Sequence, residues 1–174
     1  MATPTIDFAT LSLVDALDLA ILVEEEARDR YEELADQMAM HHTPEAERFF
    51  REMIVNESKH GADLAERRNR LFPDAPRRVR REMLWDVEAP GYEMAHAFMT
   101  ARQAMLVALD AETKAHDYFA AALPHLTNPE VKALFAELRD EEVEHQEMVK
   151  AVMARLPPDP GVDPEDYADE PVGH

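Results

Sequence analysis

The sequence has no cysteine among its 174 residues, which excludes disulfides, zinc ribbons, iron–sulfur clusters and thiol catalysis. Glycine is also scarce, with only 4 residues, and proline is concentrated at the ends of segments. Alanine, leucine, glutamate, methionine and arginine are abundant instead. This composition favours an all-α chain, and its length suits one domain with a single core.

Long apolar runs and basic residues are scarce as well. No segment approaches the ~20 apolar residues of a membrane span, and the N-terminus has no basic-then-apolar signal. We therefore expect a cytoplasmic protein that does not bind membranes. The formal net charge of -19 argues against general nucleic-acid binding and would attract cations such as Fe(II). For most of these charges an acidic surface that keeps the protein in solution is the favoured interpretation.

The motif Glu-x-x-His occurs twice, from Glu57 to His60 and from Glu142 to His145. Each copy lies where the helical repeat of apolar residues calls for a buried side chain. An ionised carboxylate costs several kcal/mol to desolvate unless it is paired or bound to a cation. Two such intrusions in one small protein indicate a metal inside a helical bundle.

Two further apolar seams each carry a single glutamate, Glu24 in the first expected helix and Glu112 in the third. The four seams run through Leu13, Leu17, Ala20, Glu24, Ala27, Tyr31, Leu34 and Met38; Ala46, Phe50, Met53, Glu57, His60 and Leu64; Phe98, Ala101, Met105, Ala108, Glu112, Ala115, Phe119 and Ala122; and Val131, Phe135, Leu138, Glu142, His145, Val149, Val152 and Leu156. A dinuclear carboxylate site in a four-helix bundle uses this set: one Glu from each of two helices and Glu-x-x-His from each of the others. The predicted metal ligands are Glu24, Glu57, His60, Glu112, Glu142 and His145.

The two halves of the chain repeat. Thr43-Pro44-Glu45 and Asn128-Pro129-Glu130 each place a capping residue before a proline at a helix start. From there the registers coincide, so that Glu57 and Glu142, like His60 and His145, are 85 residues apart. Two similar hairpins facing each other predict a pseudo-two-fold site with one histidine on each metal.

The four-helix domain is expected over residues 11–156, after an N-terminal extension of residues 1–10. A crossover of about 69–91 would join the second and third helices and span the bundle, with Leu84 and Trp85 capping the bundle or packing at a subunit interface. Residues 157–174 form an acidic, proline-rich tail that we expect to be disordered. The tail is either a solvated end or a segment that recruits the protein to a partner or compartment.

Seven arginines gather around the end of the second expected helix: Arg67, Arg68, Arg70, Arg77, Arg78, Arg80 and Arg81. Basic residues at a helix C-terminus complement its dipole, and the alternative is a docking patch for an acidic partner or subunit. The acids next to the ligands in sequence, Glu25, Glu26, Glu141 and Glu144, are expected to be solvated surface.

On these residues, roughly from Leu11 to Leu156, the chain resembles the rubrerythrin branch of the ferritin-like superfamily. The resemblance implies a four-helix bundle with a long crossover and two Fe ions per subunit, with Mn or Zn as substitutes. It also implies reduction of hydrogen peroxide or dioxygen. Glu57 and Glu142 would bridge the irons, Glu24 and Glu112 would be terminal ligands, and His60 and His145 would bind one iron each.

Two features depart from that family. Rubrerythrins usually carry a four-cysteine rubredoxin module, which is absent here, so electrons come from an external donor or from Fe(II) itself. They also carry a second glutamate at the position of Ala115. The remaining four glutamates and two histidines are closer to the ferroxidase centre of bacterioferritin. Ser58 stands where bacterioferritin has its haem-binding methionine, so no haem is expected.

The leading prediction is thus a di-iron oxidoreductase that oxidises Fe(II) with dioxygen or hydrogen peroxide, as a homodimer or higher homo-oligomer. Glu57, Glu142 and Tyr31 are the expected catalytic residues, with Tyr31 either hydrogen-bonded to a ligand carboxylate or a core aromatic residue. The alternative is a non-enzymatic iron-binding or delivery protein recruited by its tail. A purely structural bundle is disfavoured by the six aligned ligand-type residues.

Overall fold

The computed structural model describes residues 6–84 and 99–158. Four long helices make up most of this part: α1 (Leu13–Met40), α2 (Pro44–Leu71), α3 (Ala101–Ala122) and α4 (Pro129–Met153). Two short 3-10 turns, η1 (Arg81–Leu84) and η3 (Leu123–His125), complete it, and the described residues contain no strand. None of the described helices is long and apolar enough to cross a membrane.

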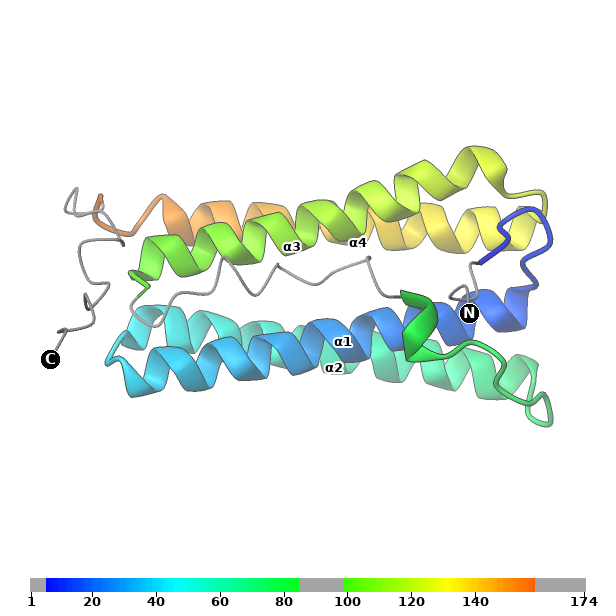
Figure 1. Cartoon of the computed structure of the whole chain (residues 1–174), viewed down its shortest axis with the longest axis horizontal. Coiled ribbons are helices and arrows are strands. Elements are labelled where there is room, and N and C mark those ends of the chain that lie inside the picture. The colour runs from blue at the N-terminus through cyan, green and yellow to red at the C-terminus, as the bar shows by residue number, and fades with distance from the viewer. Residues whose placement is uncertain (1–5, 85–98, 159–174) are drawn as a thin grey trace, which may run out of the picture.

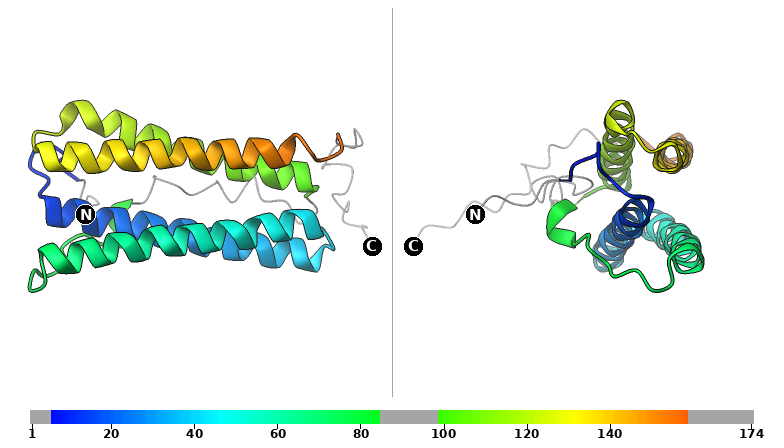
Figure 2. Two further views of the ribbon diagram at one scale, coloured as in Figure 1. Left: turned by 180° about the vertical axis from the view of Figure 1, so that it is seen from behind. Right: turned by 90° about the vertical axis from the view of Figure 1, so that its right-hand side faces the viewer.

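The helices form two antiparallel hairpins, α1–α2 and α3–α4, which lie side by side (Figures 1 and 2). Helix α2 ends at one end of the bundle and α3 begins at the other (Figure 1). This arrangement confirms the predicted ferritin-like four-helix bundle of two hairpins with a long crossover.

Local sequence signals explain where the helices begin. The Ser12 side chain accepts a hydrogen bond from the backbone of Asp15, and Thr100 forms a reciprocal capping box with Gln103. The Asn128 side chain accepts from two backbone N–H groups at the start of α4, as predicted. Thr43 holds the capping position of α2, but its side chain makes no capping bond there and its hydroxyl donates to the His41 carbonyl instead.

A tight turn joins α1 to α2. The backbone N–H of Thr43 donates to the Met38 carbonyl and that of His42 to the Ala39 carbonyl, which is the pattern of a Schellman motif. That motif needs a left-handed residue, and His42 supplies it with a φ of 56°. Glycine is the usual occupant because a Cβ atom is strained in this conformation.

Two apolar clusters fill the core, one toward each end of the bundle. In the first, Phe119 and Phe135 meet edge to face with ring centroids 5.3 Å apart. In the second, Tyr31 stacks on Phe50 at 5.8 Å. Both clusters draw residues from α1, α2, α3 and α4. The apolar seams predicted for the four helices thus supply the core, apart from Phe98, which lies outside the described residues.

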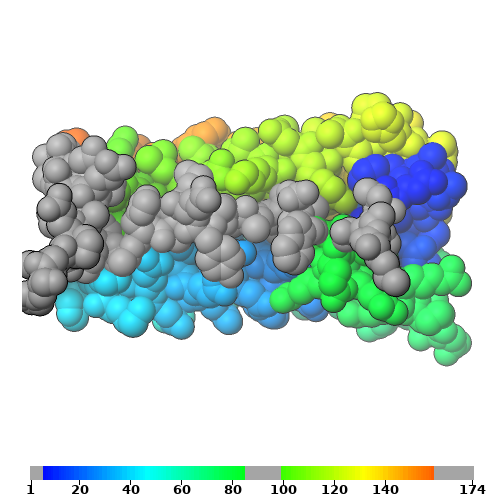
Figure 3. Space-filling model, viewed as in Figure 1, coloured from blue at the N-terminus to red at the C-terminus, as the bar shows by residue number. Residues whose placement is uncertain are grey.

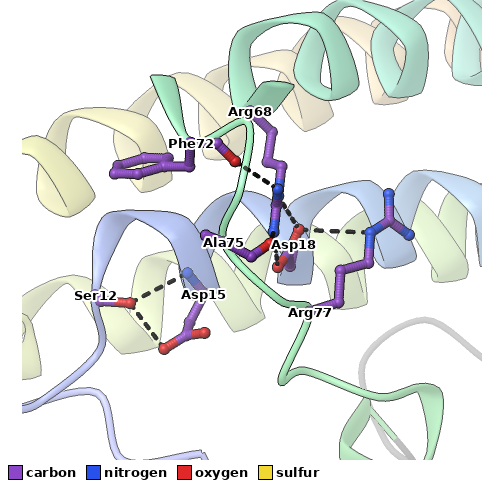
Figure 4. A network of polar contacts seen from close by, with 7 residues as sticks. All are labelled: Ser12, Asp15, Asp18, Arg68, Phe72, Ala75 and Arg77. Carbon is purple, nitrogen blue, oxygen red and sulfur yellow. Dashed lines mark hydrogen bonds and ion pairs between the residues drawn. The ribbon is translucent and has the colours of Figure 1, made fainter. Parts of the chain in front are cut away.

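A buried ion pair ties the start of the crossover to α1 (Figure 4). The guanidinium of Arg68 donates to both carboxylate oxygens of Asp18, at 2.8 and 3.3 Å, and both side chains are nearly inaccessible to solvent. The same guanidinium donates to the carbonyls of Phe72 and Ala75, and Arg77 lies 3.7 Å from Asp18. Arg68 therefore stabilises the interior of the fold and is not part of an exposed basic docking patch.

The rest of the described crossover lies beside the N-terminal segment at one end of the bundle (Figure 3). Leu84 is buried against the first apolar cluster, whereas Trp85 lies outside the described residues. Helix α2 continues to Leu71 and α3 begins at Ala101, whereas the predicted end of the crossover at about residue 91 lies outside the described residues. The predicted tail falls almost entirely outside the described residues.

Candidate metal centre

Four buried carboxylates form a polar layer between the two apolar clusters. Glu24, Glu57, Glu112 and Glu142 lie on α1, α2, α3 and α4 respectively, and each is only 3% exposed. Their positions on the apolar seams direct all four toward the bundle interior. Such a layer is costly to bury unless its charges are neutralised. Two histidines lie against it, His145 beside Glu112 in the inner half of the layer and His60 beside Glu24 in the outer half.

His145 neutralises the inner half of the layer. Its Nδ1 atom lies 3.2 Å from Oε2 of Glu112, 3.4 Å from Oε1 of Glu57 and 3.5 Å from Oε2 of Glu142. Burial opposes a charge on the imidazole, but hydrogen bonds to Glu112 and Glu142 and the charge of Glu57 raise the pKa of His145 to about 11. A pKa in that range favours the imidazolium form of His145 at neutral pH, beside the three carboxylates.

Burial also raises the pKa values of two carboxyl groups in the layer. The pKa of Glu142 rises to about 8, because desolvation outweighs its hydrogen bond to His145. Burial raises the pKa of Glu57 as well, opposed by a hydrogen bond with Glu24 and by the charge of His145. The metal-free layer therefore holds protons that a cation would replace.

The outer half of the layer contains His60, whose ring stacks on that of His145 with centroids 5.2 Å apart and planes 7° from parallel. The His60 side chain is 26% exposed against 4% for His145. Its Nδ1 atom lies 3.9 Å from Oε2 of Glu24. Burial and then the neighbouring charge of His145 lower the pKa of His60, which favours the neutral imidazole that binds metals.

The two halves are thus less alike than the predicted pseudo-two-fold symmetry implies. One difference is visible at matching positions of the repeat, Gly61 on α2 and Gln146 on α4. Gly61 lines a cavity of about 270 Å³ between α1 and α2, which reaches Glu24 and Glu57. Gln146 instead extends over the third helix and donates to the Glu112 carbonyl at 3.4 Å.

The donor set fits a pair of metal ions. The buried Nδ1 of His60 has no hydrogen-bond partner among the described residues. Oε1 of Glu57 and Oε2 of Glu142 have only the long contacts of 3.4 and 3.5 Å with His145. Ligand atoms of Glu57, His60 and His145 lie within 4.8 Å of one another, as do those of Glu112, Glu142 and His145. Two nitrogen donors among several carboxylates suit iron or manganese better than a structural zinc, and a bound cation would satisfy the orphaned atoms.

The structure brings all six predicted ligands together, but it places Tyr31 elsewhere. Tyr31 packs in the second apolar cluster, stacked on Phe50, and its buried hydroxyl has no hydrogen-bond partner in the described part of the chain. The predicted hydrogen bond from Tyr31 to a ligand carboxylate is therefore absent from this structure. Tyr31 thus lies where the alternative prediction placed it, as an aromatic residue of the core.

Sequence reasoning missed Glu141. We expected a solvated surface acid, yet its carboxylate is half-buried, and its ligand atoms lie within 4.8 Å of those of Glu24 and His60. Burial, reinforced by the charges of Glu137 and Glu142, raises the pKa of Glu141 to about 7. A usable signal was the four-residue spacing from Glu141 to His145, which places both on one side of α4.

The comparisons with known proteins agree with this fold. A family model described as Rubrerythrin matches residues 15–153, a span that contains all six ligand-type residues. Among solved structures, the chain is similar to an uncharacterised conserved protein from Magnetospirillum magnetotacticum MS-1, with 29% sequence identity and a TM-score of 0.69. That match covers 88% of this chain and 100% of the other. No curated protein matches the chain.

Proposed function

Because the chain belongs to the rubrerythrin family, we propose that it is a di-iron oxidoreductase that oxidises Fe(II) with dioxygen or hydrogen peroxide. The observation that carries this proposal is the polar layer itself. Four carboxylates and two imidazoles from four helices converge in an apolar core, and several of their buried donor atoms have no hydrogen-bond partner among the described residues. No purely structural role accounts for that cost.

Each side chain has a distinct role in this proposal. Glu57 and Glu142, whose oxygens lie 3.4 and 3.5 Å from Nδ1 of His145, would serve both ions. Glu24 and His60 would hold the outer ion, and Glu112 and His145 would hold the inner one. When bound, a pair of ferrous ions supplies two electrons, the number that reduces hydrogen peroxide to water.

The surroundings control access to the layer. The apolar clusters on both sides exclude bulk water, while the cavity beside Gly61 reaches Glu24 and Glu57 from the surface. Its volume of about 270 Å³ exceeds the ~30 Å³ that one water occupies, so dioxygen, peroxide or a hydrated ion fits.

Ala115 favours dioxygen as an oxidant. Its side chain is fully buried next to Glu112 on the inner face of α3, and it offers no carboxylate to replace a histidine on oxidation. We therefore expect His60 and His145 to remain ligands in both redox states, and dioxygen to react at least as fast as peroxide. The external electron donor, the homo-oligomer and the cytoplasmic location stay predictions.

The test is an anaerobic Fe(II) titration followed by separate stopped-flow mixing with dioxygen and with hydrogen peroxide. We expect two Fe(II) per chain and rapid oxidation by dioxygen. Glu57→Ala should lose oxidation while keeping its helical circular dichroism, because a bridging ligand serves both ions. Glu144→Ala, which changes an exposed acid on the same helix as Glu142, should behave like the wild type.

The outcomes separate the proposed function from the alternatives. Saturation at one ion per folded chain would refute a di-iron centre. Two bound ions that oxidise no faster than free Fe(II) would indicate an iron-binding or delivery protein. A large preference for peroxide would return the protein to the peroxidase class and refute the role given to Ala115.

A further inference from the structure

Glu141 reaches across from one hairpin to the other. It belongs to α4, yet its carboxylate and the ligand atoms of Glu24 on α1 and His60 on α2 lie within 4.8 Å of one another. A carboxylate oxygen, a second carboxylate oxygen and an imidazole nitrogen thus converge from three helices on the outer side of the polar layer. Three donors at this spacing can bind one ion between them.

Nothing else in the described structure accounts for this placement. Glu141 is half-buried and forms no ion pair with a lysine or arginine among the described residues. Its charged neighbours are three further acids, Glu137, Glu142 and Glu144, and one imidazole, His145, which opposes the effect of the acids only in part. Acids gathered in this way are unfavourable unless a cation lies among them.

The internal repeat shows that this acid is specific to one half. Glu141 matches Asn56 on α2, the residue just before Glu57. Asn56 is neutral, and its side chain contacts Met148 at 3.9 Å rather than the polar layer. The extra carboxylate therefore has no counterpart on α2, and it faces the more exposed of the two histidines.

We propose that Glu141 is a seventh metal ligand, which binds the ion held by Glu24 and His60. This inference rests on the proposed di-iron function and adds a residue to it. The outer ion then has three ligands of its own, whereas the inner ion has Glu112 and His145. The two positions differ in charge, so they bind metal with different affinities.

The test uses Zn(II), a redox-inert probe, so that no oxidation accompanies binding. Calorimetric titration of the metal-free wild type should show two ions per chain in two distinguishable steps. Glu141→Asn, which imports the residue found at the matching position of α2, should weaken one step by about tenfold or more, on the scale that changes around metal ligands produce. Glu144→Gln is the matched control and should leave both steps unchanged.

A crystal structure of the Zn(II)-loaded wild type supplies an independent readout that does not depend on any variant. A Glu141 oxygen about 2.0–2.2 Å from the outer ion is expected. A carboxylate that points away from the ion, or a Glu141→Asn titration that superimposes on the wild type, would overturn the inference and leave the di-iron function intact. Equal weakening by Glu144→Gln would mean that only net charge matters and would also overturn it. Wild-type protein that binds fewer than two ions would refute the di-iron function itself.

Discussion

Glu142 and His145 alone should release about two protons per chain at neutral pH when metal binds, and a bound Glu141, with a pKa of about 7, would add about half a proton. The pKa of Glu142 lies at about 8 and that of His145 at about 11 in the metal-free layer. At pH 7 a group with a pKa of about 8 is about nine-tenths protonated, and one with a pKa of about 11 is fully protonated. Ligands must lose their protons to bind a metal, so these two groups together lose about two.

The sign of the pH dependence follows from the same values. Both pKa values exceed 7, so raising the pH removes competing protons and the apparent metal affinity increases. The increase should be about a hundredfold per pH unit near pH 7, since each released proton contributes about tenfold. Above pH 8 the slope should fall toward one proton, because Glu142 has ionised while His145 has not. Exposed carboxylates, with a pKa of about 4.3, would give no such dependence.

Calorimetry measures this release directly. Zn(II) is titrated into the metal-free protein at pH 7 in buffers of different ionisation enthalpy, and the slope of observed enthalpy against buffer enthalpy gives the number of protons. A slope of about two to two and a half is expected for the wild type and for Glu144→Gln, which changes an exposed acid. A slope near zero would refute the reasoning, since it would mean that the buried layer is already ionised in the metal-free protein.

Three further predictions concern stability, each measured by chemical denaturation of the metal-free protein. Asp18→Asn leaves the buried guanidinium of Arg68 without its partner and should cost about 3–5 kcal/mol, whereas Asp36→Asn at an exposed pair should cost less than about 1 kcal/mol; equal losses would contradict the role of the buried pair. Tyr31→Phe removes a buried hydroxyl that has no hydrogen-bond partner within residues 6–84 and 99–158 and should be neutral or stabilising by about 1 kcal/mol; a clear loss of stability, or slower iron oxidation, would restore a polar role for Tyr31. His42→Gly relieves a left-handed φ and should stabilise by up to about 1 kcal/mol, and a destabilised variant would show that the turn depends on the histidine.

The sequence was sufficient to predict the helices and the grouping of the six candidate ligand residues in one layer, because both depend on local spacing. Pro44 and Pro129 mark helix starts through their own backbone restriction. The glutamates of the seams point inward because neighbouring residues on the same helical face are apolar. Both signals can be read within a single helix, without knowing which helices pack against each other.

The features that sequence reasoning missed depend on contacts between distant segments. Asp18 and Arg68 are 50 residues apart, and only the return of the chain after Phe72 encloses them. Glu141 points toward the layer because the opposite hairpin places Glu24 and His60 beside it. The unequal exposure of His60 and His145 likewise depends on how the hairpins meet, which a repeat within the sequence does not determine.

The division of the core into two apolar clusters has a consequence for motion. Each cluster contains residues from all four long helices, so each holds the two hairpins together at its own end. The polar layer between them can therefore open locally while the bundle stays folded, because local opening needs less free energy than global unfolding. Hydrogen exchange of the metal-free protein should then be faster around Glu24 and Glu57 than around Phe50 and Phe119, and bound metal should remove the difference. In that case an ion enters or leaves through local opening of the polar layer in the middle of the bundle, while the apolar clusters at both ends stay packed.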